Sequence, residues 1–355
     1  MKKIGKVLGW VGGLMGGAAL AAYATTLVTP KPEAFMIKQL FNRPYGIKNP
    51  TMYEAASGRV KVLEDLSFSS HFENSTYDLY LPIDLADNEK LPLVVWLHGG
   101  GFVGGDKSQM HEFATYLTAR SRVVVATLNY GLAPKNKYPY QLNQLATAIC
   151  YFKEEPTLAE HLDCSRIIIG GDSAGAQIAG QYVLMQTNDA YRESMGHKQS
   201  LETEQIKGFI SYCGPLAMSR LATHPHESRM VRYMLHTISR SIIKSREWTQ
   251  QAELFEASIT DHVNSCFPPS YVTDGNTRTF DMQGQAFTQR LKELKVPVVE
   301  RFFADTDRKV MHEYQFEYLT DDALVCLDET CAFIDEVLQE MKDDNGRSMY
   351  LKEIK

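Results

Sequence analysis

The stretch IIIGGDSAG, residues 167–175, places Ser173 among glycines directly after an apolar run. A short β-branched run bounded by Gly predicts a buried strand, and AGAQIAGQYVLMQ after the serine predicts a helix. Gly171, Ser173 and Gly175 form G-x-S-x-G, the pattern of a nucleophile elbow, a strand-to-helix turn so sharp that its flanking residues must lack bulk. Such a turn would hold the Ser173 hydroxyl clear of the sheet, over the positive end of the following helix. The alternative is a glycine-rich turn with a solvated serine.

Segments typical of strands and of helices alternate on both sides of this stretch. The predicted strands span residues 60–68, 75–82, 91–100, 122–130, 166–171, 206–214, 270–275 and 296–304. The predicted helices span residues 107–120, 140–154, 174–186, 280–294 and 321–341. This alternation predicts an α/β fold in which helices cover both faces of a mostly parallel central sheet. Active sites in such sheets lie at the carboxyl ends of the strands.

Composition limits the classes of function. The chain has 355 residues, 44% of them hydrophobic and 23% charged, which is enough for one large α/β domain with a substantial core. A net charge of −6 argues against nucleic acid as a partner, since no basic stripe would displace its counterions. The six cysteines form no C-x-x-C pair and are interpreted as small buried hydrophobes, with one disulfide left open if the domain is exported.

The amino terminus differs from the rest of the chain. Lys2, Lys3 and Lys6 precede residues 7–28, which carry no charge and are long enough as a helix to cross a bilayer of about 30 Å. Two interpretations compete: a retained membrane anchor, which the length favours, and a signal peptide cleaved after Ala22-Tyr23-Ala24. Either one places the body of the protein outside the cytoplasm. A buried helix of a soluble protein is the third alternative.

A second glycine motif follows the predicted strand at 91–100. His98 precedes Gly99, Gly100 and Gly101, where backbone N–H groups can approach a bound carbonyl closely. Attack on an ester carbonyl builds negative charge on its oxygen. One such donor stabilises this charge and lowers the activation barrier by about 3–4 kcal/mol. We expect the N–H groups of Gly100, Gly101 and Ala174 to form this oxyanion hole. The alternative is a flexible surface loop.

Serine needs a base, and His312 is the best of ten histidines. It lies between the last predicted strand and the last predicted helix, a position that brings it to the carboxyl edge of the sheet. His98 is expected to support the glycine turn. His111 precedes Glu112, but no second histidine follows four residues on, so the zinc pattern H-E-x-x-H is absent from the sequence.

The acid that would orient His312 has two candidates. The order Ser, then Asp or Glu, then His is typical of this elbow fold, so the acid should follow the predicted strand at 270–275. Asp274 stands at the end of that strand and is preferred, although many D-G pairs are only turn residues. Asp281 begins the next helix, where its ordinary role would be to interact with the helix dipole.

Residues 216–267 interrupt the alternation and are too long for a connecting loop. We interpret them as a helical lid over the site, and the rival interpretation is a basic helix on a membrane surface. One stretch has an apolar face of Val231, Met234, Leu235, Ile238 and Ile242, and a basic face of Arg229, Arg232, Arg240 and Lys244.

Five motifs carry a resemblance to a known family: HGGGF (98–102), NYGLAPKNKYP (129–139), GDSAG (171–175), PPSYVTDG (268–275) and HEY (312–314). From about residue 70 to 340 the chain resembles the hormone-sensitive-lipase-like, or arylacetamide-deacetylase-like, branch of the α/β-hydrolases. The resemblance implies a carboxylesterase with nucleophile Ser173, base His312 and oxyanion donors Gly100, Gly101 and Ala174. It also implies that the 216–267 insertion and the early helices form a cap.

The chain departs from the family at two positions. Gly131 stands where the family usually has a structural arginine, and Arg278 stands where the family places its catalytic aspartate. Either Asp274 supplies the carboxylate from an altered loop, or the triad is weakened.

These features predict a serine carboxylesterase that acts through an acyl-enzyme, needs no metal or organic cofactor and, by family analogy, takes short- to medium-chain esters. The alternatives are a hydrolase-fold protein that only binds a ligand, and a related peptidase or acyltransferase. The expected division is residues 1–30 as anchor or signal, 31–58 as linker and cap helices, 59–342 as the catalytic domain, and 343–355 as a polar tail.

Overall fold

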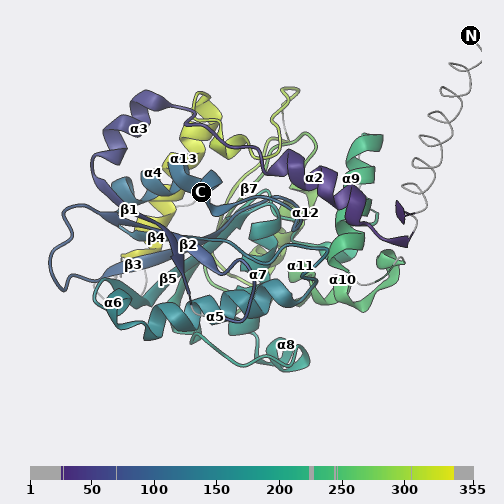
Figure 1. Cartoon of the computed structure of the whole chain (residues 1–355), viewed down its shortest axis with the longest axis horizontal. Coiled ribbons are helices and arrows are strands. Elements are labelled where there is room, and N and C mark those ends of the chain that lie inside the picture. The colour runs from purple at the N-terminus through teal and green to yellow at the C-terminus, as the bar shows by residue number, and fades with distance from the viewer. Residues whose placement is uncertain are drawn as a thin grey trace, which may run out of the picture.

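The computed structural model describes residues 25–26, 28–68, 70–223, 228–243, 245, 247–304 and 306–339. Its centre is an eight-stranded sheet in the order β1-β2-β4-β3-β5-β6-β7-β8 (Figure 1). Strand β2 is antiparallel to both of its neighbours, and all other neighbouring pairs are parallel. The strands are β1 (Val60–Ser67), β2 (Thr76–Pro82), β3 (Leu91–Leu97), β4 (Val124–Leu128), β5 (Leu162–Asp172), β6 (Ile206–Tyr212), β7 (Ser270–Thr273) and β8 (Val298–Arg301). The predicted α/β fold with a mostly parallel sheet is confirmed.

Helices cover both faces of this sheet (Figure 1). They are α2 (Lys31–Phe41), α3 (Pro50–Ser57), α4 (His111–Ser121), α5 (Tyr140–Glu154), α6 (Pro156–Ala159), α7 (Ala174–Thr187), α8 (Asp189–Ser194), α9 (Arg229–Ile242), α10 (Ala252–Glu256), α11 (Ile259–His262), α12 (Asp281–Glu293) and α13 (Asp321–Leu338). The five predicted helices correspond to α4, α5, α7, α12 and α13. The predicted start at residue 107 is wrong for α4, because a 3₁₀ turn over Lys107–Met110 precedes it.

The two faces of β3 show how the core is divided. Side chains alternate across a strand, so Leu93, Val95 and Leu97 join one buried cluster while Val94 and Trp96 join the other. The first cluster includes residues of α5, α7 and α12, and the second includes residues of α4 and α13. Strand β3 is buried along its whole length. A strand buried on both faces reads as a continuous apolar run, which is why LPLVVWL is recognisable in the sequence.

Two early helices lie at different places on the body. Helix α2 packs against α9 at one end of the molecule, and the hydroxyl of Tyr233 on α9 donates to Glu33 Oε1 on α2 at 3.2 Å (Figure 1). Helix α3 packs instead against α4 and β1. Of these two helices, α2 is therefore the one whose packing partner α9 belongs to the segment that the sequence predicts as a lid.

Residues 7–28, the predicted anchor, lie almost wholly outside the described residues, and the predicted tail at 343–355 lies entirely outside them. Among the helices that the structure does describe, none combines the length and the apolar character needed to cross a bilayer. All six cysteines are free thiols. Cys213, Cys326 and Cys331 are buried as expected, Cys150 and Cys164 are half-buried, and the expectation is wrong for Cys266, which is exposed.

Candidate active site

Ser173 occupies the sharp turn between β5 and α7. Its backbone has φ 49° and ψ −116°, outside the regions that residues with a Cβ favour. The Ser173 N–H donates to Tyr212 O on β6 at 2.8 Å, which holds the turn against the sheet. A Cβ at Gly175 would lie 2.0 Å from the Leu97 carbonyl oxygen, so no larger residue fits there. The glycines that mark this motif are therefore required by close approach of the β3 backbone.

His312 lies within hydrogen-bond distance of Ser173. Its Nε2 is 3.1 Å from Ser173 Oγ, and its loop follows β8 and precedes α13. The His312 N–H donates to Thr277 O at 3.2 Å, and Met311 forms a parallel bridge with Thr277. Burial lowers the pKa of His312 to about 4. The imidazole is therefore neutral at pH 7 and able to accept a proton.

Of the two candidate acids, Asp274 is the one that approaches His312. Asp274 Oδ1 is 3.9 Å from His312 Nδ1, and the Asp274 side chain is buried. Asp281 lies in the first turn of α12, where Gln285 Nε2 donates to its Oδ2 at 3.5 Å, and no hydrogen bond or ion pair between described residues joins Asp281 to His312. Arg278, at the family's aspartate position, has φ 56° and is exposed at the edge of the site.

The Asp274 carboxylate is held by three donors. Gly275 N–H donates to Oδ1 at 2.8 Å, Phe280 N–H donates to Oδ2 at 3.0 Å, and the Thr279 hydroxyl donates to Oδ1. Burial raises the pKa of Asp274 to about 8, although these hydrogen bonds oppose the shift. Thr279 also approaches the base, since its Oγ1 is 3.4 Å from His312 Nδ1. Nothing in the sequence singles out Thr279, because its contact depends on the path of the loop.

The glycine loop, residues 98–105, presents backbone N–H groups beside Ser173. Gly100 has φ 107° and Gly101 has φ 59°, and a Cβ at Gly100 would lie 2.2 Å from Gly104 O. Gly100, Gly101 and Ala174 line the same cavity as Ser173. Within the described part of the chain, no acceptor pairs with the N–H of Gly100 or Gly101. The three residues expected to donate to an oxyanion thus line one cavity with Ser173.

Asp172 ties this loop to the elbow, a role that the sequence did not reveal. Its Oδ2 accepts from Gly99 N–H at 2.6 Å and its Oδ1 accepts from Trp96 Nε1 at 2.9 Å. Glu313 Oε1 lies near this carboxylate. A Cβ built on Gly99 would be 2.4 Å from Asp172 Oδ2 and 2.9 Å from Glu313 Oε1, so both oxygens lie beside Gly99. Burial, and then the charge of Glu313, raise the pKa of Asp172 well above its usual range. Burial raises the pKa of Glu313 to about 7.

His98 supports the glycine loop, as expected. Its ring stacks on Tyr130 with centroids 4.4 Å apart, and its Nδ1 lies 2.6 Å from Gly99 O. The Tyr130 hydroxyl donates to His98 O at 2.9 Å. The next residue, Gly131, has no room for the arginine usual in the family, because a Cβ there would lie 2.3 Å from the ring of Tyr140.

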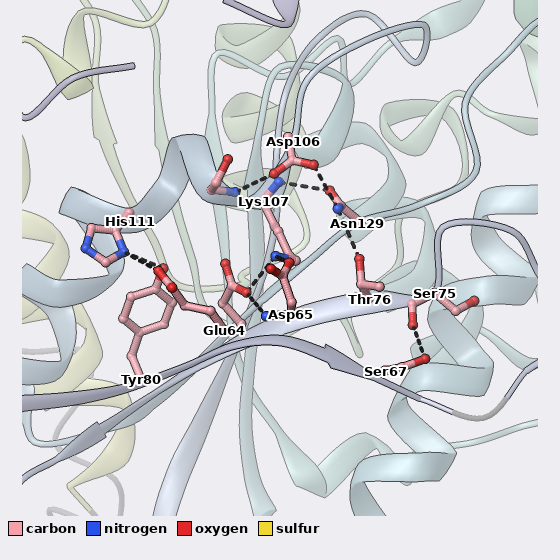
Figure 2. A network of polar contacts seen from close by, with 12 residues as sticks. Glu64, Asp65, Ser67, Ser75, Thr76, Tyr80, Asp106, Lys107, His111 and Asn129 are labelled. Carbon is pink, nitrogen blue, oxygen red and sulfur yellow. Dashed lines mark hydrogen bonds and ion pairs between the residues drawn. The ribbon is translucent and has the colours of Figure 1, made fainter. Parts of the chain in front are cut away.

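Ion pairs of Lys107 hold the far end of the loop. Lys107 Nζ lies 2.6 Å from Asp78 Oδ1 on β2, where both side chains are buried, and 2.8 Å from Oδ1 of the exposed Asp65 on β1. The backbone N–H of Lys107 donates to Asn129 Oδ1 at 2.9 Å, and Figure 2 shows Lys107 with Asp65 and Asn129. Burial alone would lower the pKa of Lys107, but the two carboxylates outweigh burial and raise it. The chain that leaves Gly105 is therefore anchored to β1, β2 and the end of β4.

A cavity of about 180 Å³ opens beside Ser173 and His312. Its wall is mainly apolar, and α9 supplies the five residues of the predicted apolar face: Val231, Met234, Leu235, Ile238 and Ile242. On the predicted basic face, Arg229 and Arg232 are exposed, Arg240 is half-buried, and Lys244 lies outside the described residues. The amphipathic pattern therefore directs the apolar side of α9 into the site.

One group of possible metal ligands coincides with the triad. Donor atoms of Cys213, Asp274 and His312 all lie within 4.8 Å of one another. Burial raises the pKa of the Cys213 thiol well above its usual range, which disfavours the thiolate that binds metals. His312 and Asp274 already face Ser173 and the loop donors, so this donor set fits proton transfer better than metal binding.

The chain is similar to known proteins in sequence. A family model described as alpha/beta hydrolase fold matches residues 94–314. The chain is 41% identical over 110 residues to probable carboxylesterase 6 of Arabidopsis thaliana, covering 29% of this chain and 33% of that protein. It is 33% identical over 146 residues to tuliposide A-converting enzyme 2 of Tulipa gesneriana, covering 38% of each chain. The chain thus spans about a third of the length of the curated relatives it matches.

Solved structures share the fold. Esterase B of Lactobacillus rhamnosis matches with a TM-score of 0.66 at 18% identity, over 81% of this chain and 91% of that one. A thermophilic carboxylesterase cloned from a metagenomic library matches with a TM-score of 0.62 at 18% identity, over 88% and 98%. At 18% identity these two structures share the fold alone, whereas the family model covers more than half of the sequence. The chain belongs to the alpha/beta-hydrolase fold family.

Proposed function

We propose that this protein is a serine carboxylesterase in which Ser173 is the nucleophile, His312 the base and Asp274 the acid. The observation that carries the proposal is the 3.1 Å separation of His312 Nε2 and Ser173 Oγ, beside the N–H groups of Gly100 and Gly101, which pair with no acceptor among the described residues. This combination supplies a nucleophile, a base and an oxyanion hole within one cavity. The carboxylesterase name of the plant relative supports the same activity.

The geometry supports a two-step reaction. As Ser173 Oγ attacks the ester carbonyl carbon, His312 Nε2 takes the hydroxyl proton, and the carbonyl oxygen becomes an oxyanion facing the N–H groups of Gly100, Gly101 and Ala174. The imidazolium then gives its proton to the leaving alcohol, and the acyl group remains on Ser173. His312 next deprotonates a water molecule, which attacks the acyl group, and Ser173 regains its proton as the acid departs.

The cavity supports apolar acyl groups of short to medium length. Most of its wall is apolar, and its volume of about 180 Å³ limits the size of a bound chain. Recognition then depends on burial of apolar surface more than on hydrogen bonds.

A fluorophosphonate probe tests this proposal, because it labels only an activated serine. We expect labelling of the wild type and its loss in Ser173→Ala. Rates for p-nitrophenyl acetate, butyrate and longer esters then define the acyl preference. An unlabelled wild type would favour a hydrolase-fold protein that only binds a ligand. Labelling without ester hydrolysis would favour the peptidase or acyltransferase alternatives.

We also propose that residues 7–28 attach the chain to a membrane, with the catalytic domain outside the cytoplasm. The uncharged segment after Lys2, Lys3 and Lys6 supports this topology. Activity-based labelling of membrane and soluble fractions, with amino-terminal sequencing of the labelled protein, tests it. A soluble labelled chain that begins after Ala24 would indicate the secreted alternative, and a soluble cytoplasmic chain that begins at Met1 would contradict both.

A further inference from the structure

We propose that Thr279 carries the influence of Asp274 to His312 as a hydroxyl relay, so that the functional unit has four side chains instead of three. The proposal rests on the esterase function proposed above. Its starting point is a comparison of two distances from His312 Nδ1: 3.9 Å to Asp274 Oδ1 and 3.4 Å to Thr279 Oγ1. The first exceeds a hydrogen bond, whereas the second is at the outer limit of one. Such contacts tighten when substrate binds.

The hydroxyl of Thr279 is already committed to the acid. It donates to Asp274 Oδ1, and both residues are almost fully buried, at 7% and 1% exposure. In the ionised form of Asp274 both carboxylate oxygens only accept, so Thr279 gives its one hydrogen to Oδ1, and Oγ1 can only accept from its other neighbour. Thr279 Oγ1 therefore accepts from His312, which requires the hydrogen of the neutral imidazole to be on Nδ1. Nε2 is then left as the acceptor that faces Ser173 Oγ at 3.1 Å.

No proton passes through Thr279 in this relay. During attack, the Ser173 proton moves to His312 Nε2, and the hydrogen on Nδ1 stays where it is. The imidazolium that forms strengthens the Nδ1–H···Oγ1 contact, and the carboxylate of Asp274 polarises the Thr279 hydroxyl in the same direction. Thr279 thus acts as a positioning residue for both the tautomer and the charge of His312.

The course of the loop explains why the relay exists here. Asp274 stands at the end of β7, and Arg278 occupies the position from which the family's aspartate would reach the base. The chain turns at Arg278 with φ 56°, which brings Thr279 back against Asp274, and Phe280 N–H closes the turn onto Asp274 Oδ2 at 3.0 Å. Thr277 O also accepts from the backbone N–H of His312. The loop that carries Asp274 and Thr279 is therefore tied to the loop that carries His312.

Two substitutions at one position separate a hydroxyl relay from a packing role. Thr279→Val keeps the branched shape and removes the hydroxyl, while Thr279→Ser keeps the hydroxyl and removes the methyl. Using p-nitrophenyl butyrate, we expect Thr279→Val to lower kcat by about 10²–10³-fold with KM within about threefold, and Thr279→Ser to stay within about fivefold of the wild type. Circular dichroism and thermal unfolding check that each variant folds, and Thr279→Ala replaces the valine variant if that one does not.

The pH profile and a double-mutant cycle complete the test. Without the relay the imidazolium loses its partner, so the step of kcat/KM that reports protonation of His312 should move to lower pH in Thr279→Val and remain in place in Thr279→Ser. Adding Asp274→Asn to Thr279→Val should cost almost nothing further, because both changes break the same link.

Three results would overturn the relay: wild-type kinetics in Thr279→Val, equal losses in the valine and serine variants, or additive losses with Asp274→Asn. Each of these is measured on a wild type that hydrolyses the ester. Failure of the esterase proposal is a different result, in which the wild type itself is neither labelled by fluorophosphonate nor active.

Discussion

Replacing Ser173 by glycine should stabilise the fold relative to replacing it by alanine, even though both variants lose the nucleophile. The backbone at this position has φ 49° and ψ −116°, and a residue with a Cβ held in such a region costs about 1–3 kcal/mol. Glycine avoids this strain but loses about 0.5–1 kcal/mol more conformational freedom on folding than alanine does. At the middle of these two ranges, Ser173→Gly is more stable than Ser173→Ala by about 1 kcal/mol.

Calorimetry can measure a difference of this size. For 355 residues the unfolding entropy corresponds to about 0.7 kcal/mol per kelvin, so Tm should be about 1–3 °C higher for Ser173→Gly than for Ser173→Ala. Denaturant midpoints at a constant m-value provide an independent comparison. Neither variant carries the hydroxyl, so loss of the contact with His312 is the same in both.

A matched pair at Gln289 supplies the control. Gln289 is an exposed residue in the interior of helix α12, where glycine should be less stable than alanine by about 0.5–1 kcal/mol. The sign of the glycine–alanine difference should therefore reverse between positions 289 and 173. The same sign at both positions would show that the elbow stores no strain, and the reasoning from its backbone angles would be refuted.

Three further predictions follow from the site and its supports. Asp274→Asn should lower kcat for p-nitrophenyl butyrate by about 10²–10⁴-fold, while Asp281→Asn stays within about threefold; indifference to both would contradict the assignment of the acid. Burial lowers the pKa of His312 to about 4 and raises the pKa of Asp274 to about 8, so kcat/KM should rise with pH in two steps, one below pH 6.5 as the base becomes neutral and one near pH 8 as the acid ionises; in Asp274→Asn only the lower step should remain, and a remaining step above pH 6.5 would be inconsistent with a buried base. Lys107→Met leaves the buried Asp78 without its cation and should reduce the free energy of unfolding by about 3–5 kcal/mol in urea, most of which Asp78→Asn should restore; a double variant as unstable as the single one would show that the loss is not electrostatic.

The central part of the fold is readable from the sequence because its strands are buried on both faces. LPLVVWL and the isoleucines before Ser173 have no polar side to obscure them, and they correspond to β3 and β5. Strand ends were less predictable. Strand β5 begins at Leu162, four residues before the predicted start, because the mixed residues Asp163 to Arg166 do not resemble a strand. The short helices α6 and α8 have too few residues to show a helical period.

The site divides in the same way. Ser173, His312 and the glycine loop could be predicted because backbone geometry restricts which residues fit there. The sequence leaves two candidates for the acid, because both Asp274 and Asp281 follow the strand after which the acid is expected. Thr279 could not be identified, because it reaches Asp274 only through a left-handed turn at Arg278, and arginine gives no signal for that conformation. Asp172 is an unspecified position of G-x-S-x-G, and its contacts with Gly99 and Trp96 cross between strands.

Asp172 has a consequence for how such an enzyme can change. One carboxylate clamps the end of β3 to the end of β5, so the attacking oxygen and the amides that receive the oxyanion belong to a single rigid unit. Much of the remaining wall of the cavity comes from α9, which shares none of the Asp172 contacts. Ile238 is the exception to this separation, since a Cβ at Gly101 would lie 2.7 Å from its Cδ1. Substitutions at the other cavity-facing positions of α9 can therefore reshape the acceptable substrates over evolutionary time without readjusting the reacting atoms, and a library aimed at new specificity should be confined to them.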